Sequence, residues 1–203
     1  MRPLLLTCLL TLACHAAVAG DLRQLLPGEA DHILGQLRGE RHAHFAVVNY
    51  ARHSSQPRFL LFERSTSRLL GSYRVSHGSG SDPDHDGFAD TFSDHEGSHA
   101  SSLGVFRTGT VYISDEPGHG LSMRLRGLSE SNANTERRAI VVHARDYMEE
   151  DFVLQHGVAG RSHGCLVLAS ADRDKAIAAL RGGALIFAID TRVGSPGYIG
   201  QRK

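Results

Sequence analysis

Cys165 and His143 have the residue types that nucleophilic catalysis requires. Cys165 ends the run GRSHGC (160–165), and His143 follows the apolar run AIVV (139–142). A thiol with an unperturbed pKa near ~8.5 is only slightly ionised at neutral pH, so a nucleophilic cysteine needs an imidazole within hydrogen-bond reach. His143, at the end of a predicted strand, is placed to accept that proton. The alternative interpretation is a buried structural cysteine beside a loop histidine.

The backbone around Cys165 is also suited to acyl transfer. Gly164 has no side chain, so the chain can approach a substrate closely at this point. We expect backbone N–H groups of this turn, including that of Gly164, to receive the oxyanion that forms when a carbonyl is attacked.

The sequence Ser-His-Gly-Cys after a strand-terminal histidine resembles the signature of the YkuD-type L,D-transpeptidases, which cross-link peptidoglycan. The chain resembles in particular the murein L,D-transpeptidase catalytic domains, over residues of about 45 to 189. The shared motifs are HGSG (77–80), FS (92–93), GS (97–98), SSLGVF (101–106), GHGLS (118–122), GL (127–128), RAIVVH (138–143) and GRS (160–162).

This resemblance implies a mainly β single domain with a few short helices, the β-sandwich of the L,D-transpeptidases. Cys165 would attack the carbonyl between the third and fourth residues of a peptidoglycan stem peptide and release D-Ala. The acyl-enzyme would then pass to an amine of a second stem, or to water. His143 would act as base and then as acid, oriented by the carbonyl of Ala144. No cofactor or metal is needed.

The resemblance also suggests substrate contacts, and two positions depart from the family pattern. Val167 stands where the family carries an arginine, and Leu166 where many members have proline. Arg161 is expected to supply a cation for a stem-peptide carboxylate instead. The other expected substrate-binding residues are Ser162, His163, His119 and His77.

The first 19 residues are typical of a secretory signal peptide. Arg2 precedes an apolar run, and Ala17-Val18-Ala19 gives the small residues of a cleavage site after Ala19. The run is shorter than the roughly 20 residues that span a bilayer, and no transmembrane segment is predicted later. Lipid attachment at Cys14 is the alternative. The mature protein is therefore expected to be exported to the periplasm or the medium, with Cys165 as its one thiol.

The composition is that of a globular protein and argues against nucleic-acid binding. Of 203 residues, 22 are basic and 22 acidic, the sequence pI is near 7.2, and 41% are hydrophobic. These values fit a globular protein and give no basic field for a phosphate backbone, so no nucleic-acid partner is predicted. The expected partner is the peptidoglycan stem peptide.

The signal-like start and the family resemblance together divide the chain into four expected segments: the signal peptide (1–19), an N-terminal lead-in (20–44), the L,D-transpeptidase-like catalytic domain (45–190) and a C-terminal tail (191–203). The lead-in is expected to be helical with a break at Pro27-Gly28. A helix capped by Ser170 is expected over 170–181, and a weaker one over 147–156. Strands are expected at 45–50, 58–64 and 68–75 as an antiparallel meander, and then at 104–113, 121–126, 139–143 and 184–189.

The polar segment 76–102 is too long for an ordinary connection, and we expect it to fold over the cleft as part of the substrate site. Within it, Asp82, Asp84 and Asp86 copy the first half of a calcium loop. Its twelfth position, which needs a bidentate glutamate, is Ser93. A polar turn is the expected interpretation.

Two rival functions remain open at this stage. A zinc-dependent peptidoglycan peptidase is suggested by the histidine count, by His77 with Asp84, and by the pair His42 and His44. A catalytically silent envelope-binding module would keep the fold without turnover.

Overall fold

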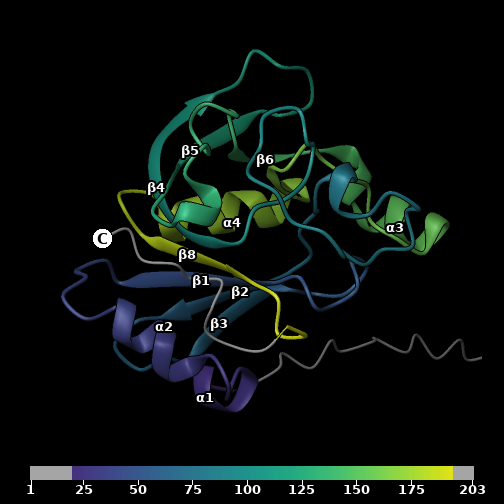
Figure 1. Cartoon of the computed structure of the whole chain (residues 1–203). Coiled ribbons are helices and arrows are strands. Elements are labelled where there is room, and N and C mark those ends of the chain that lie inside the picture. Colours follow the sequence, from purple (N-terminus) through teal and green to yellow (C-terminus); the bar gives the residue numbers. More distant parts are fainter. Residues whose placement is uncertain (1–19, 194–203) are drawn as a thin grey trace, which may run out of the picture.

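The computed structural model describes residues 20–193, which form one eight-stranded sheet with short helices packed against it (Figure 1). The prediction of a mainly β single domain with few short helices is confirmed. The predicted signal peptide, with the Cys14 alternative, and residues 194–203 of the predicted tail lie outside the described residues. Within the described residues, no helix has the length and apolar character needed to cross a bilayer.

The strands are β1 (His44–Asn49), β2 (Phe59–Glu63), β3 (Leu69–Tyr73), β4 (Gly104–Ile113), β5 (Leu121–Gly127), β6 (Val141–Ala144), β7 (Leu166–Leu168) and β8 (Leu185–Ile189). The α-helices are α1 (Leu22–Leu25), α2 (Ala30–Gln36), α3 (Glu150–His156) and α4 (Ser170–Leu180). The strand order is β3-β2-β1-β8-β4-β5-β6-β7.

The sheet joins an antiparallel meander to a second group of strands through β8. The predicted meander is confirmed, since β1 pairs antiparallel with β2, and β2 with β3. The last strand, β8, inserts between β1, to which it is parallel, and β4, to which it is antiparallel. All five of its residues are buried, as expected for a strand covered on both faces.

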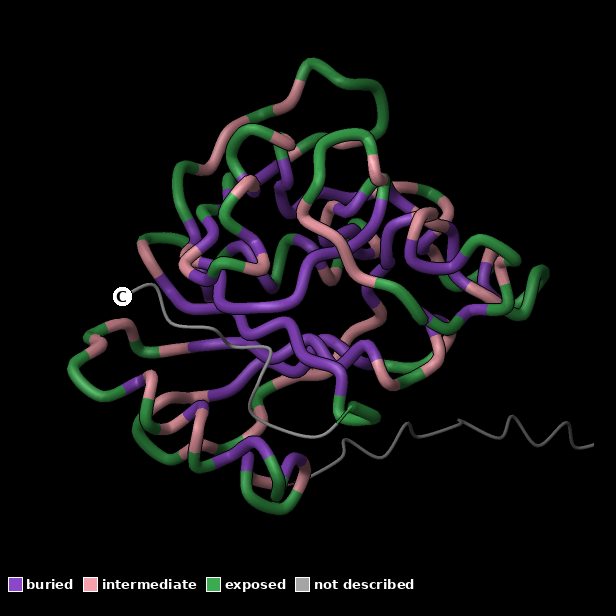
Figure 2. Tube along the Cα trace, in the orientation of Figure 1, coloured by how far each residue is buried: buried purple, intermediate pink, exposed green. Residues whose placement is uncertain are grey.

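Alternation along the central strands divides the core into two clusters. In β1, Ala46 and Val48 belong to the cluster that contains α4, whereas Phe45 and Val47 face the cluster that contains α1 and α2. A strand with a side-chain period of two produces this division when both faces are covered. Helix α4 lies between the two halves of the bent sheet and contacts β1 as well as β5, β6 and β7. Figure 2 shows the resulting concentration of buried residues along the middle of the molecule.

The N-terminal lead-in is packed on the sheet. Two short helices form on either side of Pro27-Gly28, as the sequence predicts. The side chains of Leu22 and Ile33 are fully buried in the cluster formed with β1 and β8. Within the described residues, the lead-in therefore shares a core with the strands.

The predicted cap of α4 is wrong by one residue. Ala169, not Ser170, is the N-cap residue, and it has no side-chain group that could cap the helix. The Ser170 backbone N–H instead bonds the Glu149 carboxylate at 2.8 Å. Glu149 therefore takes the place of a capping side chain, although it belongs to another segment of the chain.

We expect Ile33→Ala to lower the free energy of unfolding by about 2–5 kcal/mol, because it empties space between α2 and the sheet. Denaturant unfolding followed by circular dichroism would measure this. Asp31→Ala, on the exposed side of the same helix, is the control and should change stability far less. A lead-in that unfolds in a separate transition would contradict a shared core.

Candidate active site

A cavity of about 320 Å³ is lined by residues of β6, of the segment that follows it, and of the turn that precedes β7. It brings together Cys165, His143 and four of the five predicted substrate-binding residues. Two further residues that the sequence analysis did not assign, Arg145 and Tyr147, also line it. The full set of lining residues is His119, His143, Arg145, Tyr147, Arg161, Ser162, His163 and Cys165.

The pairing of β6 with β7 places the candidate nucleophile and the candidate base on one face of the sheet. The two strands are parallel, with Val142 opposite Leu166 and His143 opposite Val167. Val142, Leu166 and Leu168 point into the core around α4. Because side chains alternate along a strand, His143 and Cys165 then project from the other face, where the cavity lies.

His143 is buried and held in a defined tautomer. The residue is 4% exposed, and Nδ1 lies 3.0 Å from the carbonyl oxygen of Ala144. The carbonyl can only accept, so Nδ1 donates and Nε2 is left as the acceptor. Burial lowers the pKa of His143 to about 4, against the opposing effect of the Ala144 hydrogen bond. The imidazole is therefore neutral at pH 7 and able to take a proton.

The Cys165 thiol is protonated at rest. Its hydrogen bond goes to the carbonyl oxygen of Ala139, at 3.8 Å, and not to the imidazole. Burial raises the pKa of the thiol, while the Val141 N–H and the charge of Arg138 act in the opposite direction. Catalytic hydrogen bonds are often long or absent before substrate binds, so this geometry is that of a resting site.

Ser162 braces the turn that carries the nucleophile. Its hydroxyl accepts the Gly164 N–H at 3.0 Å and donates to the Cys165 carbonyl at 2.9 Å. The Gly164 N–H is thus already bonded and is not available to an oxyanion, which corrects the role predicted for it. Glycine is nevertheless required there, because φ is +107° and a Cβ would lie 2.6 Å from the Ala100 oxygen.

The remaining predicted substrate contacts surround this turn. His119 stacks on His143 with a centroid distance of 3.7 Å, and His163 stacks on His99 at 4.0 Å. The Arg161 guanidinium donates to the backbone carbonyl of Asp82. All three predicted residues line the cavity.

His77 does not line the cavity, which corrects its predicted role as a substrate contact. Its side chain is 1% exposed and both ring nitrogens are engaged. Nδ1 accepts from the fully buried Arg58 at 2.9 Å, so Nε2 carries the proton and donates to Asp82 at 2.8 Å. The His77 carbonyl also accepts the Ser162 N–H at 2.8 Å. His77 thus links a buried charge network to the cysteine turn.

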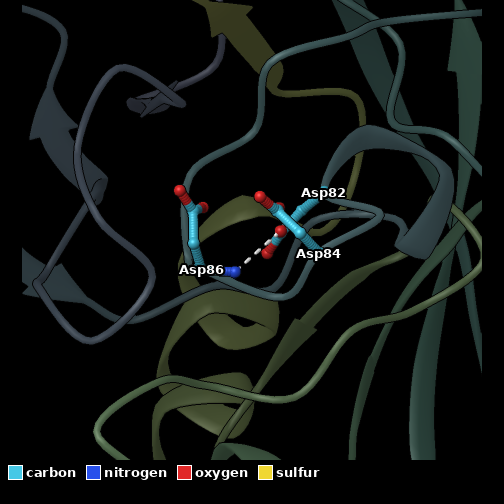
Figure 3. A group of neighbouring side chains, drawn as sticks. All are labelled: Asp82, Asp84 and Asp86. Atoms are coloured by element: carbon cyan, nitrogen blue, oxygen red, sulfur yellow. Dashed lines mark hydrogen bonds between the residues drawn. The ribbon is translucent and has the colours of Figure 1, made fainter.

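The three aspartates lie close together, but Asp82 is committed to the protein itself. Figure 3 shows the Asp86 backbone N–H directed at the Asp82 carboxylate, at 3.0 Å. The other Asp82 oxygen accepts from Gly87 at 3.1 Å and from His77. These bonds identify a tight polar turn, as the sequence predicts.

The residues named for a zinc site are not brought together. His42 and His44 bond the backbone carbonyls of Arg181 and Ala179, at the C-terminal end of α4. His77 is enclosed by Arg58 and Asp82. Within residues 20–193, the one group of three or more side chains able to hold a metal is the aspartate turn.

The polar segment 76–102 packs against the cysteine turn, where His99 stacks on His163, and it does not cover the cleft as predicted. Residues lining the cavity come from other segments. Arg138, with a side chain 4% exposed, bonds the carbonyls of Ser93 and Ala100 and so ties this segment to the start of β6. The buried serines of segment 76–102, and Asp82, form hydrogen bonds within the protein. These bonds explain why an ordered segment has such a polar composition.

Arg145 and Tyr147 were missed because they belong to no motif used in the sequence analysis. A usable signal was present, since both follow directly on the strand that ends in the candidate base. Residues just beyond a strand end are well placed to reach the same site.

The comparison with known families agrees with this geometry. The model for the L,D-transpeptidase catalytic domain matches residues 31–189. This chain belongs to that family. No curated protein sequence matches it.

Several solved L,D-transpeptidases are similar in structure. One from Mycobacterium smegmatis has 15% identity and a TM-score of 0.44, covering 72% of this chain and 58% of that one. L,D-transpeptidase 3 from Mycobacterium tuberculosis has 15% identity and a TM-score of 0.45, covering 73% and 61%. One from Stackebrandtia nassauensis has 14% identity and a TM-score of 0.44, covering 76% and 59%. The chain spans about three fifths of the length of these structures.

We expect Asp82→Asn to lower the free energy of unfolding by about 3 kcal/mol, because it leaves the Arg58 charge buried without its counter-charge. Thermal or denaturant unfolding would measure the loss. Asp84→Asn, an exposed residue of the same turn, is the matched control and should change stability little. Equal losses in the two variants would contradict the network.

Proposed function

We propose that this protein is an exported cysteine acyl-transferase that carries out L,D-transpeptidation of peptidoglycan stem peptides. Membership of the L,D-transpeptidase catalytic domain family supports the reaction class. The observation that carries the residue assignment is the cavity shared by Cys165 and His143, which project from one face of paired strands. Export rests on the signal-like sequence of residues 1–19.

The first half-reaction forms a thioester. The thiol of Cys165 leaves the Ala139 carbonyl and gives its proton to Nε2 of His143 as the sulfur attacks the carbonyl carbon of the third stem residue. The tetrahedral intermediate collapses with cleavage of the C–N bond. His143 returns the proton to the leaving nitrogen, and D-Ala departs as the free amino acid.

The second half-reaction regenerates the enzyme. An amine of a second stem attacks the thioester carbon, and His143 accepts the proton that this nitrogen loses. Cleavage of the C–S bond leaves the new peptide bond and releases the cross-linked product, and His143 returns the proton to the sulfur. Water in place of the amine gives hydrolysis by the same steps. The carbonyl of Ala144 steadies the imidazolium in both half-reactions.

The electrostatics of the cavity suit a substrate with carboxylates. Arg145 and Arg161 line it together with three histidines, and none of its lining residues is acidic. Cations in a partly enclosed site attract anionic groups and orient them.

The proposal is tested by incubating purified tetrapeptide muropeptides with the wild type, Cys165→Ala, His143→Ala and the double variant. We expect each single change to lower turnover by several orders of magnitude and the double variant to be little worse, because nucleophile and base act as one unit. Chromatography with mass detection identifies cross-linked and hydrolysed products.

Retained folding of the variants, checked by circular dichroism, is the control for that experiment. Equal product formation by the wild type and Cys165→Ala would refute the cysteine mechanism. A folded wild type without any product would favour the catalytically silent module, and activity lost to a chelator would favour a metallopeptidase.

The pH dependence of the same reaction should reflect the buried base. Because burial lowers the pKa of His143 to about 4, the neutral imidazole persists above that pH, and kcat/KM should fall as the pH drops through it. His119 contributes to this lowering, so His119→Gln should move the acid limb to higher pH. An acid limb near the ordinary histidine pKa in the wild type would contradict the assignment.

A further inference from the structure

The chemistry of the leaving group restricts where its carboxylate can be bound. This inference rests on the proposed function, in which His143 protonates the nitrogen of the departing C-terminal residue. The α-carboxylate of that residue is attached to the carbon next to the same nitrogen. A cation that binds this carboxylate must therefore lie beside His143 in the cavity.

Arg145 is the arginine that meets this condition. It follows β6 two residues after His143 and lines the same cavity. Its side chain packs by Gly118, where a Cβ would lie 3.6 Å from the Arg145 Cδ, next to His119 and its stacked partner His143. Burial lowers the pKa of both His119 and His143, and the positive charge of Arg145 adds to this lowering.

The charge of Arg145 is only loosely balanced within the protein. Its ion pair is with Asp146, at 3.9 Å from Nε, and the Asp146 side chain is 91% exposed. The same Asp146 oxygen accepts the Tyr147 N–H at 2.9 Å. An exposed pair at that distance contributes little, so the guanidinium can exchange it for a substrate carboxylate at small cost.

Arg161, the arginine that the sequence favours, is engaged elsewhere. Its guanidinium donates to the Asp82 carbonyl. Another arginine of this region, Arg173, does not line the cavity. Arg173 in turn donates to the carbonyls of His119 and Leu121. Arg145 is thus the cavity arginine close to the leaving nitrogen.

We propose that Arg145 binds the α-carboxylate of the departing C-terminal residue and so makes the site selective for stem peptides whose terminal carboxylate is free. A guanidinium can bind a carboxylate through two parallel hydrogen bonds, which also orients the leaving nitrogen toward His143. Arg161 contacts another part of the stem.

The test compares two substrates: a stem tetrapeptide that ends in D-Ala, and the same peptide that ends in D-alaninamide. Hydrogen bonds between charged groups contribute about 1.5–3 kcal/mol, so Arg145→Gln should lower kcat/KM for the acid by about 10- to 150-fold and leave that for the amide nearly unchanged. Arg145→Lys should retain part of the preference for the acid. Arg161→Gln should affect both substrates equally, and Arg126→Gln, an exposed arginine of β5, should affect neither.

Because both substrates meet the same His143, an effect of Arg145 on the imidazole alone would change both rates by one factor. That result, or a loss of acid preference in Arg161→Gln instead, would overturn the proposal. Circular dichroism of each variant separates misfolding from lost recognition.

A binding measurement keeps this inference separate from the proposed function. In the Cys165→Ala background, calorimetric titration with the acid and the amide measures recognition without turnover. We expect tighter binding of the acid, lost when Arg145→Gln is added. If the wild type cleaves neither peptide, the proposed function fails while this titration still decides the role of Arg145; equal affinities for acid and amide would overturn that role.

Discussion

The Arg58 guanidinium has no access to water, and a buried cation is tolerated only where the fold surrounds it with acceptors. Burial lowers its pKa to about 10, so it stays charged at neutral pH, and it donates to the carbonyls of Val75 and Arg52 and to His77. His77 connects this charge to Asp82. The backbone carbonyls of His77 and Asp82 then hold Ser162 and Arg161. The position of the cysteine turn therefore depends on how one buried charge is neutralised.

The second constraint is the parallel pairing of β6 with β7. A shift of one residue in this register would turn either His143 or Cys165 into the core around α4, because side chains alternate along a strand. The core-facing residues of the two strands prevent that shift, since Val142, Leu166 and Leu168 must stay buried. Core packing, and not a direct bond between the two catalytic candidates, thus places them on one face. This arrangement lets the Cys165 thiol donate its hydrogen bond to the Ala139 carbonyl instead of to His143.

Local patterns in the sequence predicted those features that depend on neighbours along the chain. The strand alternation, the break at Pro27-Gly28 and the common cavity of Cys165 and His143 all belong to this group. The predictions that are wrong concern long-range contacts. The sequence favours His77 as a substrate contact because nothing near it in sequence reveals Arg58. It favours segment 76–102 as a cover because the partners of its polar residues are distant in sequence. Arg145 was missed because its relation to the cavity depends on where β6 ends.

If the protein is exported as proposed, the neutral resting state of Cys165 has a consequence for the survival of its free thiol in an oxidising environment. Peroxide and disulfides react with the thiolate, so a thiol with a raised pKa is oxidised slowly. Burial and the contact with Ala139 keep Cys165 in the less reactive form, and in the proposed reaction the thiol loses its proton to His143 only as it attacks a carbonyl. The environment that delays ionisation of this thiol therefore also protects it from irreversible oxidation.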